Sequence, residues 1–312
     1  MKFVKLFIVL FLIQAIISIK VANKNGCDEP TKKVANKLYT CVKKLGKGNQ
    51  GTVFLVKDTA GKEYAFKQTI EEDMEIIKKN KTIYDAYKRV NSKYVMKIYE
   101  CSLKKGGLDE NGKRLGFLKL LLEPINGGIL FDYKFTSGSD VLEKYLMLIK
   151  GLIDLDKARI LHNDIKSDNI MIDSVSGDLK IIDFDNSILF SKNPEEIEEL
   201  LKSVRIQQMR ESIYNFLYTT FKNLPYYDTS LSKDSESHKL MKKLNDDGDF
   251  RSIPDLAKFV FTAEEFNCMK FIIRSALSSQ NYFRNESFVT GFVNETVPAT
   301  PAKYRQIFQS KK

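Results

Sequence analysis

The most informative segment of this 312-residue sequence reads HNDIKSDN and spans residues 162–169. It sets Asp164 five residues before Asn169, and a second segment, DFD at 183–185, follows a short apolar run. Phosphoryl transfer needs a carboxylate that orients a hydroxyl and accepts its proton, and it needs oxygen ligands that hold Mg²⁺ against the phosphates. Asp164, Asn169 and Asp183 are residues of these types, in the order that this chemistry uses.

A glycine-rich segment, GKGNQGTV at residues 46–53, lies earlier in the chain between two β-rich runs. Glycine lets backbone amides approach phosphates closely, because it has no Cβ to collide with them. A dinucleotide-binding turn shares this spacing but needs a helix directly after the glycines, whereas a β-rich run, 52–56, follows here. We therefore expect a phosphate-binding loop between two strands. Its candidate nucleotide contacts are Gly46, Gly48, Gly51 and Val53.

The hydrophobic pattern predicts two lobes of different character. Five β-rich runs and one helix follow the order βββαββ before residue 124, and the chain beyond it is mainly helical. We expect an α+β fold, with a five-stranded antiparallel sheet plus one helix in residues 39–123, then a hinge and a mainly helical lobe in 124–312. The expected strands are 39–45, 52–56, 63–68, 94–101 and 115–122 around a helix at 69–90. The second lobe is expected to hold helices at 140–156 (with Asp140 as N-cap), from Pro194, at 200–221 and at 262–277, and strands at 170–173 and 179–182.

Residues 1–18 differ from the rest, because Lys2 and Lys5 precede an apolar run that ends at a small residue, Ser18. This pattern predicts a secretory signal peptide, and the run is shorter than the roughly 20 residues of a spanning helix. We expect a protein that is secreted or lies within the secretory pathway, with no membrane segment after cleavage. An uncleaved anchor is the alternative. Residues 19–38, rich in Lys and Asn, are expected to form a basic linker.

The composition, 43% hydrophobic and 29% charged, can bury a substantial core and excludes wholesale disorder. The net charge of +10 is scattered along the chain, so we expect no nucleic-acid partner. Of the four cysteines, Cys27 and Cys41 flank a basic segment and could pair in an oxidising compartment. Cys101 and Cys268 lie in apolar surroundings and are expected to be buried thiols.

Together these segments resemble the eukaryotic protein kinases, from about Tyr39 to the end of the chain. The glycine loop, the AFK at 65–67, the HNDIKSDN segment and the following Asp-Phe have the family's order and spacing. The resemblance implies that Asp164 is the catalytic base and that Lys166 neutralises the transferring phosphate. It also implies a protein substrate, and ATP with Mg²⁺ as cofactor, Mn²⁺ being the alternative metal.

The same resemblance assigns the remaining site residues. Asn169 and Asp183 would hold the metal, and Lys67 would act on the phosphates together with the glycine loop. The segment LEPINGG at 122–128 is similar to the family's hinge. There Leu122 would be the gatekeeper, and backbone groups of Glu123 and Ile125 would bond the adenine. Ala65 joins Val53 among the expected nucleotide contacts.

Several positions depart from the family pattern. Asn163 stands where the family has an arginine that meets an activation-loop phosphate, and Asp185 replaces a glycine. No Ala-Pro-Glu follows Asp183 before the helix at 207–221, in which Met209 stands at the place of an anchoring aspartate. These changes concern regulation and substrate docking more than phosphate chemistry, so we expect an active, divergent enzyme.

The glutamate that should pair with Lys67 is also missing from its usual place. The aligned position holds Ile83, while Asp85 lies on a poorly fitting face of the expected helix and Glu75 is too close in sequence to Lys67. This ion pair is left unassigned.

Three functions fit the sequence. The first is a secreted, ATP-dependent protein kinase of the Ser/Thr type, for which Lys166 two residues after the base is the characteristic feature. The second is a small-molecule kinase, because His-Asn-Asp and Ile-Asp-Phe-Asp also look like choline and aminoglycoside kinases. The third is a pseudokinase that binds nucleotide or a partner without catalysis.

Overall fold

The computed structural model describes residues 25–48, 51–71, 73–108 and 114–189, together with the single positions 212, 239, 262 and 263. The chain divides into two compact units. The first comprises Met1–Val90 and Met96–Pro124, and the second comprises Asn91–Val95 and Ile125–Lys312. The passage from one unit to the other after Pro124 lies one residue beyond the lobe boundary that the sequence predicts.

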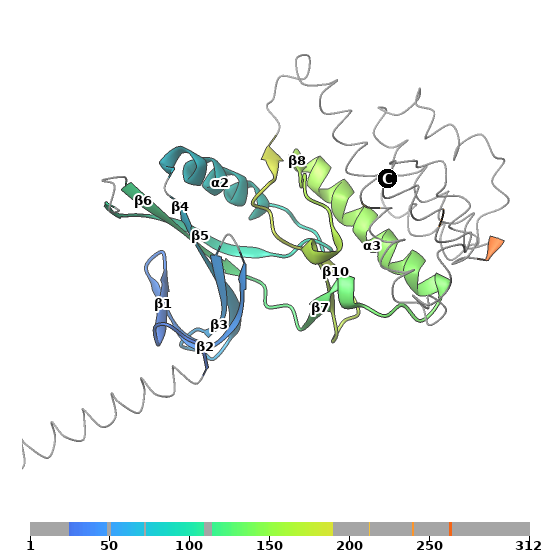
Figure 1. Ribbon diagram of the computed structural model, residues 1–312, viewed down its shortest axis with the longest axis horizontal. Coiled ribbons are helices and arrows are strands. Elements are labelled where there is room, and N and C mark those ends of the chain that lie inside the picture. The colour runs from blue at the N-terminus through green and yellow to red at the C-terminus, as the bar shows by residue number, and fades with distance from the viewer. Residues whose placement is uncertain are drawn as a thin grey trace, which may run out of the picture. The chain divides into compact units, whose positions relative to one another are not determined.

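An antiparallel sheet with the strand order β1-β2-β3-β4-β6-β5 forms the body of the first unit (Figure 1). It has six strands, so the prediction of five was wrong by one strand at the N-terminal edge. β2, β3, β4 and β6 contain the predicted runs, whereas β5 begins at Ile98 and not at the predicted Tyr94. Both β5 and β6 extend further into the polar connection between them than the sequence suggested. The strands are β1 (Thr31–Val34), β2 (Lys37–Gly48), β3 (Gly51–Lys57), β4 (Glu63–Glu71), β5 (Ile98–Leu108) and β6 (Arg114–Leu122).

The additional strand, β1, lies in the segment that the sequence predicts to be a linker. Its burial alternates, with Lys32 and Val34 turned inward. Lys32 is only 4% exposed because its ammonium group lies 4.3 Å from the centre of the Phe54 ring and pairs with Asp28. A lysine-rich run therefore looks like a linker in sequence, yet the aliphatic stem of Lys32 and the side chain of Val34 complete a buried face.

A disulfide between Cys27 and Cys41 fastens the chain ahead of β1 to β2. Both cysteines belong to the folded first unit, which realises the pairing that the sequence left open. Cys101, on β5, is a buried free thiol as predicted, and burial raises its pKa to about 12.

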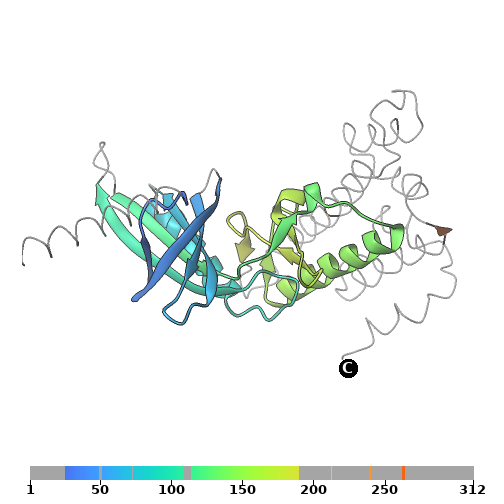
Figure 2. The ribbon, with the colours of Figure 1, turned by 90° about the horizontal axis from the view of Figure 1, so that it is seen from below.

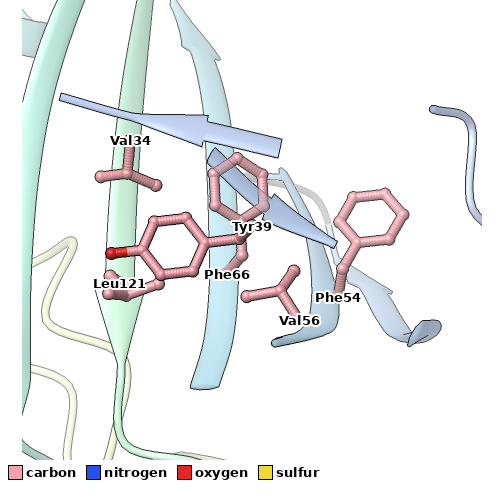
Figure 3. Close-up of a cluster of buried hydrophobic side chains, with 6 residues drawn as sticks. All are labelled: Val34, Tyr39, Phe54, Val56, Phe66 and Leu121. Atoms are coloured by element: carbon pink, nitrogen blue, oxygen red, sulfur yellow. The ribbon is translucent and has the colours of Figure 1, made fainter. Parts of the chain in front are cut away.

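Six buried side chains fill the space between β1 and the face of the sheet beneath it (Figure 3). They come from five neighbouring strands, and Tyr64 and Tyr99 extend the cluster by edge-to-face contacts. Burying each large apolar side chain stabilises the fold by about 1.5–3 kcal/mol. The cluster consists of Val34, Tyr39, Phe54, Val56, Phe66 and Leu121.

Helix α2 (Met74–Tyr87) packs on the opposite face of the same sheet, where a Cβ at Gly116 would meet the side chains of Met74 and Ile77. The helix begins later than predicted, because β4 continues to Glu71 and Asp73 caps the helix by accepting the backbone N–H of Glu75 at 2.8 Å. Its buried face carries Ile77, Ile83, Tyr84 and Tyr87. Ile76, although apolar, is 46% exposed.

The second unit is built around helix α3 (Gly138–Lys157), which is buried along most of its length. Ser137 is its N-cap and accepts the N–H of Asp140 at 3.2 Å, so the prediction of Asp140 as the cap was wrong. Asp140 instead accepts the N–H of Thr136, the residue directly before the cap. The N-cap is the last residue with a non-helical backbone before the helix, and here that residue is Ser137, at φ −165° and ψ 167°.

Short strands and 3₁₀ turns complete the described part of this unit. One three-stranded sheet has the order β10-β9-β7, and β11 pairs with β8. Figure 2 shows these strands beside α3. The elements are β7 (Gly127–Ile129), η1 (Leu130–Asp132), β8 (Ile160–Leu161), η2 (Ser167–Asn169), β9 (Ile170–Asp173), β10 (Leu179–Ile181) and β11 (Ile188–Leu189).

Several predictions fall outside the described residues. These are the signal peptide, the helices from Pro194 and at 200–221, the body of the helix at 262–277, and the positions of Met209 and Cys268. The mainly helical character of the whole second lobe therefore stays a prediction. Across the ranges that the structure describes, no helix combines the length and the apolar character needed to cross a membrane.

Candidate active site

The glycine segment forms the facing ends of β2 and β3, where Gly48 lies opposite Gly51 and Gly46 opposite Val53. Gly51 has φ +154°, and a Cβ there would lie 2.2 Å from the carbonyl oxygen of Gln68. The sheet itself therefore requires glycine at this position.

Gly46 and Gly48 are different, because a Cβ on either would meet nothing within 4 Å. Packing among the residues that the structure describes therefore does not require glycine at either position. A phosphate-binding loop, where the missing Cβ makes room for the ligand, is the role that the sequence predicts for the two glycines, and it stays a prediction.

Lys67 lies in the middle of β4 in direct register with Val53. Val53 is in turn opposite Gly46 on β2, so the lysine, the valine and the glycine form one row across three adjacent strands. Ala65 lies two residues along β4, opposite Leu122 on β6. Because directly paired residues share a face of the sheet, these predicted nucleotide contacts are gathered on one face of the first unit.

The candidate acidic partners of Lys67 on α2 are engaged along their own helix. Glu75 pairs with Lys78 at 2.6 Å, and Asp85 pairs with Lys81. Ile83, at the aligned position, is 3% exposed and packs into the core. Both carboxylates thus form ion pairs within α2, Glu75 with a lysine three residues on and Asp85 with a lysine four residues before it.

Glu123, the first residue after β6, is held by two bonds to Lys97. Its N–H donates to the Lys97 carbonyl at 2.9 Å, and its Oε2 accepts the Lys97 N–H at 3.0 Å. The backbone N–H of Glu123 therefore already donates a hydrogen bond inside the first unit. In the predicted adenine contact, the backbone group of Glu123 that could take part is its carbonyl, as an acceptor. Ile125, the other predicted hinge contact, is half-buried and opens the second unit.

The second unit gathers the predicted phosphotransfer residues around the carboxylate of Asp164. Its Oδ2 accepts hydrogen bonds from Lys166 Nζ at 2.8 Å, Asn169 Nδ2 at 2.8 Å and Asn186 Nδ2 at 3.2 Å. Oδ1 accepts none from the residues that the structure describes. The three hydrogen bonds are thus gathered on one oxygen of the carboxylate.

The electrostatics keep this carboxylate ionised. Burial by itself would raise the pKa of Asp164, but the hydrogen bond and charge of Lys166, with the two amide donors, outweigh burial and lower the pKa. The pKa of Lys166 is raised, first by its hydrogen bond with Asp164. At neutral pH the pair is a carboxylate and an ammonium ion.

The orientation of Asn169 suits a metal ligand. Both its bonds from Nδ2 go to Asp164, one to the backbone oxygen at 2.9 Å and one to Oδ2. The amide oxygen therefore points away from the donor side, and amide and carboxylate oxygens are ligands that Mg²⁺ prefers. The Ile182 N–H donates to the Asn169 carbonyl at 2.9 Å, which ties the residue before Asp183 to the backbone of Asn169.

His162 forms hydrogen bonds with two segments of the site, at Asp164 and at Ile182. Its Nδ1 accepts the Asp164 N–H at 3.3 Å, so the ring proton is on Nε2, which bonds the Ile182 carbonyl at 2.9 Å. The ring is fully buried, lies edge-to-face with Phe184, and has a pKa lowered by burial. A neutral histidine thus joins the segment carrying the base to the segment carrying Asp183.

Two of the site positions have left-handed backbones, Asn163 at φ +62° and Asp183 at φ +60°. This conformation costs most residues about 1–2 kcal/mol, and Asn and Asp are the side chains that adopt it with least strain. Strain of this kind is found where a site demands one backbone geometry. The asparagine that departs from the family pattern is therefore well suited to its local backbone.

Sequence reasoning missed Asn186. It lies three residues beyond Asp183 and 22 residues from the base, and no motif or periodicity in the sequence connects it with Asp164. The pairing of β11 with β8 and the hydrogen bond from Ser187 Oγ to the His162 carbonyl return the chain beside the HNDIKSDN segment.

Known proteins give the same picture. Residues 39–209 match the protein kinase domain. Serine/threonine-protein kinase cot-1 of Neurospora crassa is 34% identical over 165 residues, which cover 49% of this chain and 25% of that protein. The cAMP-dependent protein kinase catalytic subunit 2 of Drosophila melanogaster is 30% identical over 152 residues, or 45% of this chain and 39% of that protein.

Mitogen-activated protein kinase kinase kinase 15 of Mus musculus is 26% identical over 149 residues, or 46% of this chain and 10% of that protein. The chain thus spans well under half the length of each of these relatives. The matched family range, in contrast, covers more than half of the 312 residues and includes every site residue described above. The chain belongs to the protein kinase family.

Proposed function

We propose that this chain transfers the γ-phosphoryl group of ATP to serine or threonine hydroxyls of proteins. The observation that carries the proposal is the unequal hydrogen bonding of the two carboxylate oxygens of Asp164. Oδ2 accepts three hydrogen bonds, while Oδ1 accepts none from the described residues. A carboxylate held in this way can accept a hydroxyl proton at Oδ1 without changing its other bonds.

The neighbouring residues supply the remaining requirements. Lys166, fixed as an ammonium ion at 2.8 Å from the base, would neutralise charge that develops on the transferred group. Asn169 and Asp183 would hold Mg²⁺ through their side-chain oxygens, and the ion would neutralise phosphate charge. In the first unit, Lys67 and the glycine segment would bind the phosphates.

A protein substrate is favoured over a small molecule by two features. The glycine segment is complete, and Lys166 follows the base by two residues, as in kinases of the Ser/Thr type. One of the relatives, cot-1, is a serine/threonine-protein kinase by name. The loss of the usual arginine at Asn163 argues against control by an activation-loop phosphate, because an amide cannot replace the paired charge.

We also propose that the enzyme works in the secretory pathway or outside the cell. The support is the apolar start of the chain, residues 1–18, and the disulfide between Cys27 and Cys41, since disulfides persist in oxidising compartments. Expression in a secreting host, followed by N-terminal sequencing of the product, tests this. Cleavage after about residue 18 supports it, and retention of the full N-terminus inside the cytosol contradicts it.

The activity is tested by giving the chain from Ile19 onward labelled ATP with Mg²⁺, a mixed protein substrate and a panel of small alcohols. Asp164→Asn keeps the shape of the base but cannot accept the proton, and we expect it to lower phosphate transfer by about 10²–10⁴-fold. Asp168→Asn is the matched control, because Asp168 is an exposed carboxylate in the same loop. It should leave the rate unchanged.

The acceptor decides between the three functions. Phosphoserine or phosphothreonine that disappears in Asp164→Asn supports a protein kinase. Label on small alcohols alone would move the enzyme to the small-molecule kinases. Nucleotide binding by a folded sample that transfers nothing would make the chain a pseudokinase.

A further inference from the structure

We propose that Asn186 is a positioning residue that holds the carboxylate of Asp164 in its reactive orientation. The inference rests on the proposed role of Asp164 as the base. Its starting point is the bond from Asn186 Nδ2 to Asp164 Oδ2 at 3.2 Å, which joins two segments 22 residues apart.

The place of Asn186 is determined by the segment that carries it. The next residue, Ser187, is 2% exposed, and its Oγ donates to the His162 carbonyl at 3.2 Å. Its N–H donates to the Phe184 carbonyl at 3.1 Å. One residue further on, β11 begins its pairing with β8. Asn186 therefore stands on a backbone that is anchored on both sides.

A second amide connects the same segments in the opposite direction. Asn163 Nδ2 donates to the backbone carbonyl of Asn186 at 3.3 Å. The residue that replaces the family's arginine thus holds the backbone of Asn186, and the Asn186 side chain holds the base. Asn163 and Asn186 thus form one short chain of amide hydrogen bonds that ends on Asp164.

Asn186, the third donor to Asp164 Oδ2, lies on a different segment from the other two donors. Lys166 and Asn169 follow Asp164 in the same loop, so they approach the carboxylate from one segment. Asn186 approaches from another segment, and a donor from a separate direction restricts rotation of the carboxylate plane. When the Lys166 ammonium turns toward a phosphate, Asn169 and Asn186 still hold Oδ2, and Oδ1 keeps facing the substrate.

The contact can be tested without any turnover. In protein labelled with ¹⁵N-asparagine, the side-chain amide signal of Asn186 is identified by its loss in Asn186→Ala. We expect that signal to shift in Asp164→Ala, because the variant removes its acceptor, and to stay in place in Asp168→Asn. An Asn186 signal that ignores Asp164→Ala would overturn the proposal.

The kinetic test separates positioning from binding and folding. We expect Asn186→Ala to lower kcat about tenfold, the loss of one hydrogen bond to a charged group, with KM for ATP and the thermal midpoint unchanged. Asn186→Ser, which keeps a donor, should recover part of the rate. Asn91→Ala removes an exposed asparagine from the same unit and is the matched control.

The outcomes distinguish this inference from the proposed function. Equal kcat for the wild type and Asn186→Ala, in a sample that phosphorylates protein, would refute the role of Asn186 and leave the kinase activity standing. A rise in KM for ATP with unchanged kcat would also refute it. If the wild type transfers no phosphate, the proposed function fails, and the amide signal still decides whether the contact exists.

Discussion

Opening the disulfide between Cys27 and Cys41 should weaken the first unit more than any change to its surface. The two cysteines are 14 residues apart, and the loop between them contains all of β1. β1 is only four residues long and lies at the edge of the sheet, paired with β2 alone. Without the disulfide, the strand and its part of the core depend on those few backbone bonds.

The size of the effect follows from the loop. Closing a loop of about 15 residues removes unfolded-chain entropy worth about 3 kcal/mol at 25 °C. Val34, which β1 contributes to the core cluster, is 1% exposed and would be worth roughly a further 1.5 kcal/mol if β1 detached. We therefore expect the free energy of unfolding to fall by about 3 kcal/mol, and by more if the strand leaves the sheet.

Urea unfolding of the wild type and of the Cys27→Ala/Cys41→Ala double variant measures this difference. With a urea dependence of about 1–3 kcal/mol per molar, the midpoint should fall by about 1–3 M. Adding reductant to the wild type should reproduce the shift, while adding it to the double variant should do nothing. Identical midpoints for the two proteins would show that β1 is not a stabilising part of the sheet, and the reasoning above would be wrong.

Three further results are expected. Gly51→Ala should destabilise the first unit by about 2–3 kcal/mol in urea unfolding, because its Cβ would lie 2.2 Å from a backbone oxygen, whereas Gly46→Ala should fold normally and lose nucleotide affinity in a titration with ATP. Burial lowers the pKa of His162, so below a pH of about 6.5 the unfolded chain binds a proton that the folded chain excludes. The free energy of unfolding should therefore fall as the pH drops through that range, and it should fall less steeply in His162→Gln. Cys101, whose pKa burial raises to about 12, should resist alkylation at pH 8 in native protein and react after unfolding, as mass spectrometry would show; rapid native labelling would contradict its burial.

Sequence patterns predicted β2, β3, β4 and β6 of the first unit well, because these strands alternate or run apolar between clear turn signals, whereas the bounds of β5 were wrong at both ends. They failed at β1, where a four-residue strand of sequence TKKV has too few apolar positions for any periodicity. Its burial depends on a disulfide and on the packing of Lys32 over Phe54, and neither contact is local in sequence. The same limit shifted the start of α2, because β4 could continue through Ile70 to Glu71 only by pairing with β6.

Within the site, the sequence predicted the residue types and the contacts inside one loop, but not the contacts between distant segments. Asp164, Lys166 and Asn169 lie within one short loop, so their spacing alone places them close together, and the structure shows them bonded. The row of Gly46, Val53 and Lys67 depends on the register of two strand pairs, which the sequence does not specify.

The sequence by itself predicted the residues of a base, a lysine, two oxygen ligands and a glycine loop, in the order of the protein kinase family to which the chain belongs. These are properties of residue type and short spacing, which a linear chain states directly. The tertiary structure alone decided that a sixth strand closes the core and that Asn186 reaches Asp164 across 22 residues. Such contacts arise from strand pairing and packing between segments that are distant in the sequence. The hydrogen bonds and burial that stabilise them form only when the folded chain brings those segments together.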